Sequence, residues 1–424
     1  MHDIELKFNA VIRLLLYVML FWLPYSPAVI ETCVILSVIV WLVKRIWLSF
    51  QMCEGNRFVA FKPAATPLNT PIAFFLLACL LSSAGSIFFP DSVLSFINKT
   101  LEWFVVYFLV VEVFTERKHF LIFLGVFLLT STATAIDSLV QFYWTHKDFF
   151  MGHKIIPGDP ATAGFKTTND LGAYLTFVVA LLVLLPFWGA EKRPQKILFS
   201  AMLVLAVWAM FVSMTRGAFL GIALAVLGVA GISLNQKNAK WRNCFFAVGV
   251  LVAVLFVANL LQPDWLSRWL NNSKIHTADW RLTIWQDTIA MTMNVPLFGN
   301  GINTFMVIFQ DYSPLAKVNP TYAHNCFIQI AAETGLFGFG CFMAILWQLC
   351  ATVWKHFAGT FKNQEKFLNV LYLGIILGAV AFLVQSFFDT SFYSLKLSVY
   401  FWYMVGILIA MDNLFQKRIF HGQN

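Results

Sequence analysis

Charged residues are scarce in this sequence. Only 12% of its 424 residues are Asp, Glu, Lys or Arg, whereas about a quarter are charged in an ordinary soluble domain. Hydrophobic residues make up 59%, and the mean hydropathy is +0.74. Apolar stretches of membrane-spanning length recur from end to end, which excludes a soluble core with one anchor. The composition therefore predicts a polytopic membrane protein.

Several chemical signatures are also missing. The sequence contains no GxxxxGK[ST], GxGxxG, GxSxG or HExxH motif, so nucleotide binding, an esterase-type serine and a zinc protease site have no support. The predicted outer loops hold no DxD motif and no paired acids that would bind a divalent cation. Seven cysteines lie mostly in apolar segments without a CxxC pair, which predicts neither disulfide nor zinc site. We therefore expect no metal and no cofactor.

The net charge of +8 is explained by where the Lys and Arg residues stand relative to the apolar segments. Lys and Arg cluster in short loops on alternate sides of the apolar segments, as the positive-inside rule requires. This distribution argues against nucleic-acid binding. All six basic loops fall on one side if twelve helices alternate from a cytoplasmic N-terminus. Both termini are then predicted to be cytoplasmic.

The predicted fold is all-α, with about twelve transmembrane helices. Helices are required because lipid offers no partner for a free backbone group. Three regions follow: transmembrane helices one to nine in 1–262, a large periplasmic loop with interfacial helices in 263–323, and helices ten to twelve in 324–424. The apolar segments are 12–24, 27–43, 69–89, 101–115, 119–143, 171–189, 197–214, 217–234, 244–262, 325–354, 367–388 and 397–414.

Two outer segments are long enough to hold a site, 144–170 and especially 263–323. In the second, Thr277-Ala278-Asp279 is a plausible helix start, and apolar side chains follow at helical spacing. Such a helix would lie in the interface with its tryptophans at headgroup depth. A turn at 296–301, Pro-Leu-Phe-Gly-Asn-Gly, would end it.

Arg216 lies between the seventh and eighth apolar segments, at the predicted outer boundary. Its guanidinium could snorkel to lipid phosphate or cap a helix. It could instead be a fixed phosphate clamp, because its planar fork suits phosphate oxygens. Gly217 and Gly221 form a small face on which a neighbouring helix could approach closely.

Arg281 follows Trp280 on the predicted interfacial helix. It could be solvated or contact a lipid headgroup. It could also be a second cation that faces the same diphosphate as Arg216.

His324 and Asn325 open the tenth segment at the outer surface. A single His is more often structural than catalytic, but Asn325, Gln329 and Glu333 repeat every four residues and form one polar stripe. Because polar groups in a membrane are costly, the stripe must face the bundle or an aqueous cavity. A neutral imidazole at its mouth could take a proton from a sugar hydroxyl.

The 144–170 segment ends in further polar residues. Asn169 and Asp170 stand just before the sixth helix, where they could cap it or take part in a site. Lys166 could add a phosphate contact. In the apolar segments, Glu112 could satisfy neighbouring helices.

In their order and placement, these elements resemble the O-antigen ligase/polymerase superfamily, and most closely the lipopolysaccharide O-antigen ligase. The layout is similar over most of the chain, with twelve helices and a large outer loop between the ninth and tenth. The likeness rests on Thr215-Arg216-Gly217, on Trp280-Arg281 with Pro296, Gly299 and Gly301, and on His324-Asn325 with Glu333, Gly335 and Gly338.

The resemblance implies an inverting, metal-independent glycosyl transfer at the periplasmic face of the inner membrane. A polysaccharide would pass from undecaprenyl diphosphate to a sugar hydroxyl of the lipid A core, with the polyprenyl tail in a lipid-facing groove. Arg216 and Arg281 would bind the diphosphate and His324 would deprotonate the acceptor. Asn325 and Lys166 would be further substrate-binding residues.

Two alternative functions remain open from the sequence. An O-antigen polymerase would use the same lipid-diphosphate donor but extend another lipid-linked glycan. A lipid or glycan transporter would instead predict charged groups near the bilayer midplane and no covalent change. The cations noted above lie at the outer boundary, which favours surface chemistry.

Overall fold

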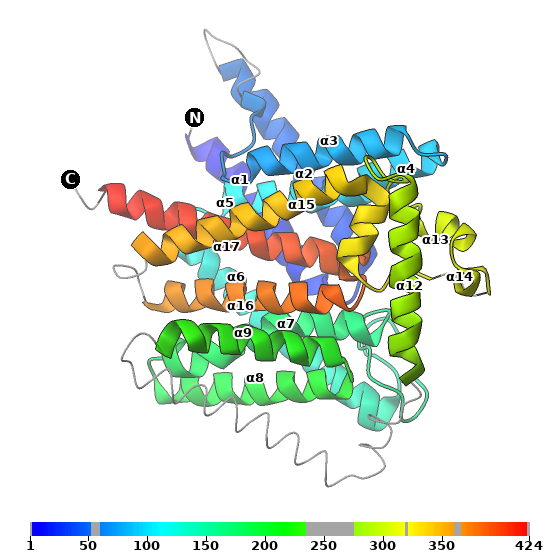
Figure 1. Ribbon diagram of the computed structural model, residues 1–424. Coiled ribbons are helices and arrows are strands. Elements are labelled where there is room, and N and C mark those ends of the chain that lie inside the picture. The colour runs from blue at the N-terminus through cyan, green and yellow to red at the C-terminus, as the bar shows by residue number, and fades with distance from the viewer. Residues whose placement is uncertain (1, 52–59, 235–274, 319–320, 360–365, 422–424) are drawn as a thin grey trace.

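The protein is a bundle of helices that run side by side (Figure 1). The structure is a computed structural model that describes residues 2–51, 60–234, 275–318, 321–359 and 366–421. Within these ranges the extended structure is one isolated bridge between Lys147 and Lys154. The predicted all-α class is confirmed.

Eight described helices, some of them composite, are long and apolar enough to cross a membrane, so the protein is a multi-pass membrane protein. They are α2 (Pro27–Gln51), α4 (Phe89–Ser95) with η2 (Phe96–Thr100) and α5 (Leu101–Val113), α6 (Arg117–Val140) with η3 (Gln141–Thr145), α7 (Thr168–Leu184) with η4 (Leu185–Gly189), α8 (Arg193–Val212), α15 (Cys326–Gly359), α16 (Lys366–Phe387) and α17 (Leu395–His421). The helices α1 (His2–Trp22), α3 (Asn69–Ala84) and α9 (Arg216–Leu234) accompany them.

The predicted apolar segments that fall within the described ranges coincide with helices. The ninth predicted segment, 244–262, lies outside the described residues, as does the first part of the loop 263–323. The count of twelve transmembrane helices therefore stays a prediction.

The centre of the bundle is formed by α7, α16 and α17. Every side chain of α7 from Leu171 to Leu184 is buried, which explains why this helix is apolar all round. Its contact with α16 is close because Gly374 and Gly378 face Leu181 and Phe177; a Cβ at either glycine would stand about 2.5 Å or less from those side chains.

The predicted small face of α9 is confirmed. A Cβ on Gly221 would lie 2.4 Å from the carbonyl oxygen of Ala381, and one on Gly217 would lie 2.1 Å from the Gln385 side chain. Both contacts are with α16 or its C-terminal end. The two glycines therefore let the backbones of α9 and α16 approach and hold the start of α9 against its neighbour.

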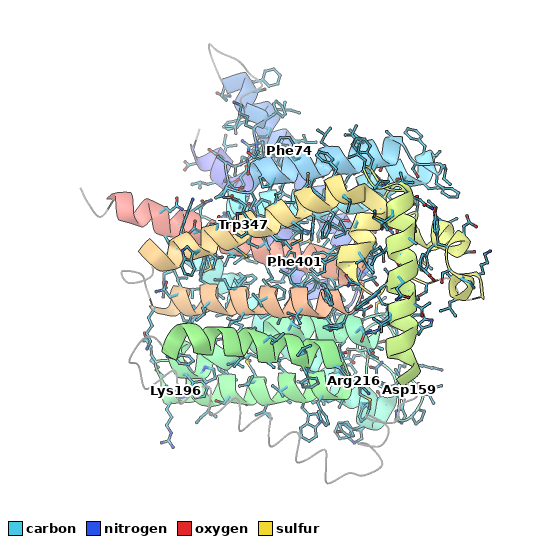
Figure 2. All side chains as sticks on the ribbon, in the orientation of Figure 1. Phe74, Asp159, Lys196, Arg216, Trp347 and Phe401 are labelled. Carbon is cyan, nitrogen blue, oxygen red and sulfur yellow. The ribbon has the colours of Figure 1, made fainter. Side chains whose placement is uncertain are left out.

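The two ends of the bundle differ. Both termini and Lys196 lie at one end, whereas Arg216 and Asp159 lie at the other (Figures 1 and 2). At the end with the termini, the Glu112 side chain accepts from Lys44, Arg45 and the Trp41 indole, which ties α2 to α5. This fits the expectation that neighbouring helices satisfy Glu112.

The far end is covered by α12 (Ile275–Asn294), which crosses the ends of the other helices (Figure 1). The short helices α13 (Phe305–Ile308), η5 (Phe309–Asp311) and α14 (Pro314–Val318) follow it. The predicted helix and the turn after it are both present. The position of α12 in the membrane interface stays a prediction.

The helix α15 is broken inside the membrane-spanning region. Gly335 has φ 68° and ψ 178°, a backbone conformation open to glycine and strained for other residues. The continuous helix predicted over 325–354 is wrong in this respect, because a glycine within an apolar run does not by itself reveal a break.

Residues 296–301 satisfy the backbone groups that the break releases. The amides of Leu336 and Phe337 donate to the carbonyls of Pro296 (2.7 Å) and Leu297 (3.3 Å). In return, the amides of Asn300 and Gly301 donate to the carbonyls of Ala332 (3.2 Å) and Glu333 (2.9 Å). The segment after α12 therefore replaces the missing helical hydrogen bonds of α15, as a low-dielectric environment requires.

We expect Gly221→Ala to lower the free energy of unfolding by about 1–3 kcal/mol, because the new methyl group overlaps Ala381. The matched control is Gly125→Ala on α6, where a Cβ meets no atom within 4 Å. Thermal unfolding of the purified variants in detergent measures both. Equal melting temperatures for the two variants would contradict the close α9–α16 contact.

Candidate active site

His324 stands directly before α15, in a left-handed backbone conformation with φ 49°. Non-glycine residues seldom adopt this conformation, and it turns the chain sharply into the helix. The imidazole contacts Asp389 through Nδ1 (3.3 Å to Oδ1) and Thr321 through Nε2 (3.2 Å to Oγ1). The ring is held on both of its nitrogens at the end of the bundle.

Asp389 lies in the turn between α16 and η7 (Ser391–Tyr393). Its side chain is 12% exposed and accepts from the Thr390 amide at 2.9 Å and from Asn169. Burial acts to raise the pKa of Asp389, but its hydrogen bonds, above all that with His324, bring the pKa below the ordinary value. Asp389 is therefore a carboxylate that orients His324.

Arg281 reaches the same place from α12. It is half-buried, and the Asp389 carboxylate and the Arg216 guanidinium both lie within electrostatic range. Burial and then Arg216 lower the pKa of Arg281, while Asp389 opposes the change. Two guanidinium groups thus lie within electrostatic range of each other, which favours the binding of an anion in this region.

Two tryptophans of α12 hold it against the start of α15. The Trp280 ring lies 5.3 Å from the His324 ring, centroid to centroid. The Trp285 indole donates to the carbonyl of Ala323 at 3.0 Å. These contacts hold α12, which carries Arg281, beside Ala323 and His324.

Arg216 is the first residue of α9 and is exposed. The turn before it is ordered by Met214, which has φ 54°, and by the Thr215 hydroxyl, which donates to the carbonyl of Thr168 at 2.9 Å. That bond ties the Arg216 turn to the first residue of α7, next to Asn169. The structure therefore brings Arg216, Arg281 and His324 to one end of the bundle.

The other two predicted binding residues behave differently. Lys166 is exposed in the segment before α7, and no described contact joins it to Arg216, Arg281 or His324. Asn325 is 1% exposed, and its side-chain oxygen accepts from the amides of Phe327 (2.9 Å) and Ile328 (3.3 Å). Asn325 therefore caps α15, and its oxygen is turned to the helix.

The predicted polar stripe is confirmed as a buried feature. Asn325, Gln329 and Glu333 are each at most 1% exposed. The Gln329 side chain accepts from the Ala323 amide at 3.2 Å and donates to Glu333 at 3.5 Å. The stripe thus joins the mouth of the site to the break in α15.

Sequence reasoning missed Asp389 and the part played by Asn169. The helix cap of α7 is Thr167, whose hydroxyl accepts from the Asp170 amide at 3.1 Å. Asn169 is therefore available to bind Asp389. A signal was present: Asp389 is an acid in the short outer loop between the predicted segments 367–388 and 397–414.

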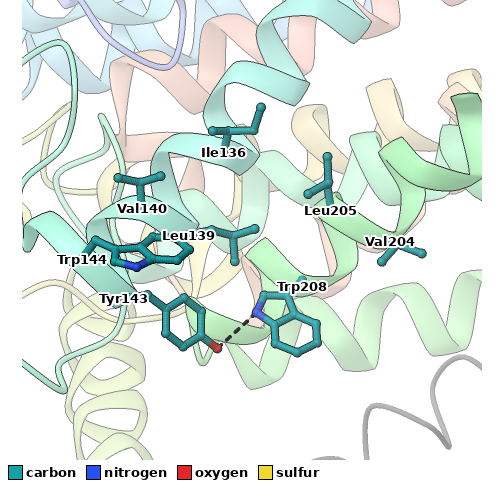
Figure 3. A pocket seen from close by; sticks show the side chains of 8 residues that line it. All are labelled: Ile136, Leu139, Val140, Tyr143, Trp144, Val204, Leu205 and Trp208. Atoms are coloured by element: carbon teal, nitrogen blue, oxygen red, sulfur yellow. Dashed lines mark hydrogen bonds between the residues drawn. The ribbon is translucent and has the colours of Figure 1, made fainter.

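An apolar groove of about 400 Å³ opens on the flank of the bundle (Figure 3). Its lining comes from α6, η3 and α8, and Tyr143 and Trp208 are joined across it by a hydrogen bond of 3.2 Å. Aromatic side chains that carry one polar group are typical of the membrane interface. The surface suits a hydrocarbon chain, and α8 leads from it to the Arg216 turn.

The described residues contain no group of three or more His, Cys, Asp or Glu side chains placed to hold a metal ion. The charged groups described at the candidate site include the two guanidinium groups and the Asp389 carboxylate, and Asp170 lies within electrostatic range of Asp389.

We expect Asp389→Asn to lower the free energy of unfolding by about 2 kcal/mol near neutral pH, because it removes a buried charged hydrogen-bond partner. A carboxyl group with a depressed pKa stabilises the folded state above its unfolded-state pKa, and the contribution is lost as pH falls through the folded-state pKa. The difference from the parent protein should therefore shrink below about pH 4. Melting temperatures of both proteins across the acid range test this, and a difference that is constant with pH would contradict it.

Comparison with known sequences finds related proteins over this part of the chain. Residues 201–343 match the Wzy_C family, described as O-antigen ligase. A further match is the teichuronic acid biosynthesis protein TuaE of Bacillus subtilis (strain 168), which is 21% identical over 264 residues, or 60% of this chain and 52% of that protein. The chain thus spans about half the length of the curated relative. The matched region runs from α8 into α15 and carries Arg216, Arg281 and His324, so this multi-pass membrane protein is similar to the O-antigen ligase family over the segment that holds its candidate site.

Proposed function

We propose that the protein is an O-antigen ligase. It joins a polysaccharide carried on undecaprenyl diphosphate to a sugar hydroxyl of the lipid A core, at the periplasmic face of the inner membrane. The proposal is supported by the His324–Asp389 pair and by Arg281, which lies within electrostatic range of both Asp389 and Arg216. Arg216 lies at the end of the bundle away from the termini (Figure 2).

The chemistry is a single displacement at the anomeric carbon. A bond forms between the acceptor hydroxyl oxygen and that carbon, while the bond to the diphosphate oxygen breaks and its electron pair leaves with undecaprenyl diphosphate. His324 takes the proton of the hydroxyl, and the Asp389 carboxylate stabilises the imidazolium that results. Arg216 and Arg281 stabilise the negative charge that grows on the leaving diphosphate.

The surroundings of the site suit such a donor. Arg281 belongs to α12, which crosses one end of the bundle (Figure 1). We expect that end to be the outer membrane interface, where a diphosphate headgroup would lie. The apolar groove on α6 and α8 offers a surface for the polyprenyl tail. The matched family and the relative named for teichuronic acid biosynthesis support work on a lipid-linked glycan, and the lipid A-core acceptor is the part of the proposal specific to this chain.

An O-antigen polymerase is the nearest alternative, because it needs the same cationic clamp for the same donor. A transporter is less consistent with the structure, since Arg216 and Arg281 lie at the end of the bundle and not at its middle.

We expect Arg216→Ala, Arg281→Ala and His324→Ala each to lower the rate of glycan transfer about 100-fold or more in an inserted, folded protein. Arg216→Lys should also be impaired, because a point charge does not reproduce the guanidinium fork. The measurement is formation of joined product from purified protein, donor and acceptor in detergent, without metal or nucleotide.

The control for these variants is Lys196→Ala, which removes a cation at the opposite end of the bundle and should leave the rate unchanged. Full activity of normally expressed Arg281→Ala would remove that residue from the mechanism. Absence of any product with the parent protein would count against a transferase.

Gene deletion should separate a ligase from a polymerase. We expect loss of a ligase to leave bare lipid A core while long lipid-linked polymer accumulates. Loss of a polymerase would leave core bearing at most single repeats. Gel analysis of lipopolysaccharide, with complementation by the parent gene and by His324→Ala, makes the distinction.

A further inference from the structure

Glu333 is a buried carboxylate of α15 that the proposed chemistry does not use. It stands two residues before the break at Gly335 and is 1% exposed. An ionisable group buried within a membrane-spanning helix is costly unless it is fully bonded. The partners of this carboxylate therefore show what it does in the fold.

The Glu333 carboxylate joins segments that are far apart in the sequence. Its Oε2 accepts from the backbone amide of Asn303 at 2.9 Å and from the Tyr393 hydroxyl at 3.1 Å. Its Oε1 accepts from Gln329 at 3.5 Å. One side chain thus connects the segment after α12, the turn before α17 and the polar stripe of α15.

The connected segments are those that carry the candidate site. Residues 295–303 follow α12, which holds Arg281. Tyr393 ends the turn that begins beside Asp389, and Gln329 binds the Ala323 amide next to His324. The three routes from Glu333 therefore lead to three different members of the site.

The backbone around Glu333 strengthens the same junction. Its own carbonyl accepts from the Ser82 hydroxyl of α3 at 2.5 Å and from the Gly301 amide at 2.9 Å. The carbonyl of Asn300 accepts from Ser86 at 2.7 Å. The segment 295–303 is thereby held between α3 and α15, and it has little freedom to move without Glu333 moving too.

We propose that Glu333 is a positioning residue, which holds α12 and the 389–393 turn against α15 so that Arg281 and Asp389 meet His324. The predicted effect of Glu333 on the rate rests on the proposed function. The predicted effect of Glu333 on the structure does not. A shift of about 1 Å in reacting groups can cost about 100-fold in rate, so such a junction suffices to control activity.

Hydrogen exchange tests the structural consequence without any activity. In Glu333→Ala, amide exchange measured by mass spectrometry in detergent should rise at 300–303 and also at 280–285 and 321–325. The matched control is Thr334→Ala, whose hydroxyl donates within α15 to the Ile330 carbonyl at 2.7 Å; its exchange pattern should stay that of the parent protein. A rise confined to 300–303 would overturn the proposal.

A double-mutant cycle tests the kinetic consequence. If Glu333 acts by placing Arg281, then Arg281→Ala should cost about 100-fold in the parent protein and less than about 10-fold when Glu333→Ala is already present. Equal factors in both backgrounds would overturn the positioning role. Glu333→Gln, which keeps one acceptor oxygen, should retain more activity than Glu333→Ala.

Folding and function can be told apart. If Glu333→Ala does not accumulate in the membrane, Tyr393→Phe removes one donor to the carboxylate and carries the same cycle and exchange measurements. If the parent protein transfers no glycan, the proposed function fails while the exchange experiment still decides the role of Glu333.

Discussion

The arrangement of the site depends on how the broken helix α15 keeps its backbone hydrogen-bonded. A membrane offers no water to the amides and carbonyls that the break at Gly335 releases. Residues 296–301 supply four of the missing partners, and in doing so they bring the C-terminal end of α12 against the break in α15. The helix α12 is therefore anchored by hydrogen bonds that α15 cannot make alone.

This anchoring explains why an outer helix can contribute to a precise site. An amphipathic helix at a membrane surface is free to slide and rotate when headgroups are its only contacts. Here the segment 296–301 fixes the C-terminal end of α12 against α15, and Trp280 and Trp285 of α12 contact His324 and Ala323. Arg281 is thereby held within electrostatic range of Asp389 and Arg216.

The charged groups at the site differ in their burial and in their partners. Asp389 is buried, bonded to His324 and held ionised by its hydrogen bonds. Arg281 lies within electrostatic range of that charge, and Arg216, the first residue of α9, is exposed. The backbone has a positive φ at Met214, two residues before Arg216, and at His324. Such strained conformations are common where side chains are directed at a ligand.

The sequence by itself determined the class of the protein, the positions of its described helices, including the one that begins close to Thr277, and the residues Arg216, Arg281 and His324 as candidates. The hydrophobicity of a segment and the charge of a loop are local properties. They can be recognised in the sequence without knowledge of the tertiary packing. Tertiary structure alone decided the rest: that α15 breaks at Gly335, that Asn325 caps a helix, and that Asp389 is the partner of His324. Each of these depends on contacts between residues far apart in the chain, because a backbone break or a buried carboxylate is stable only when distant segments supply its hydrogen bonds.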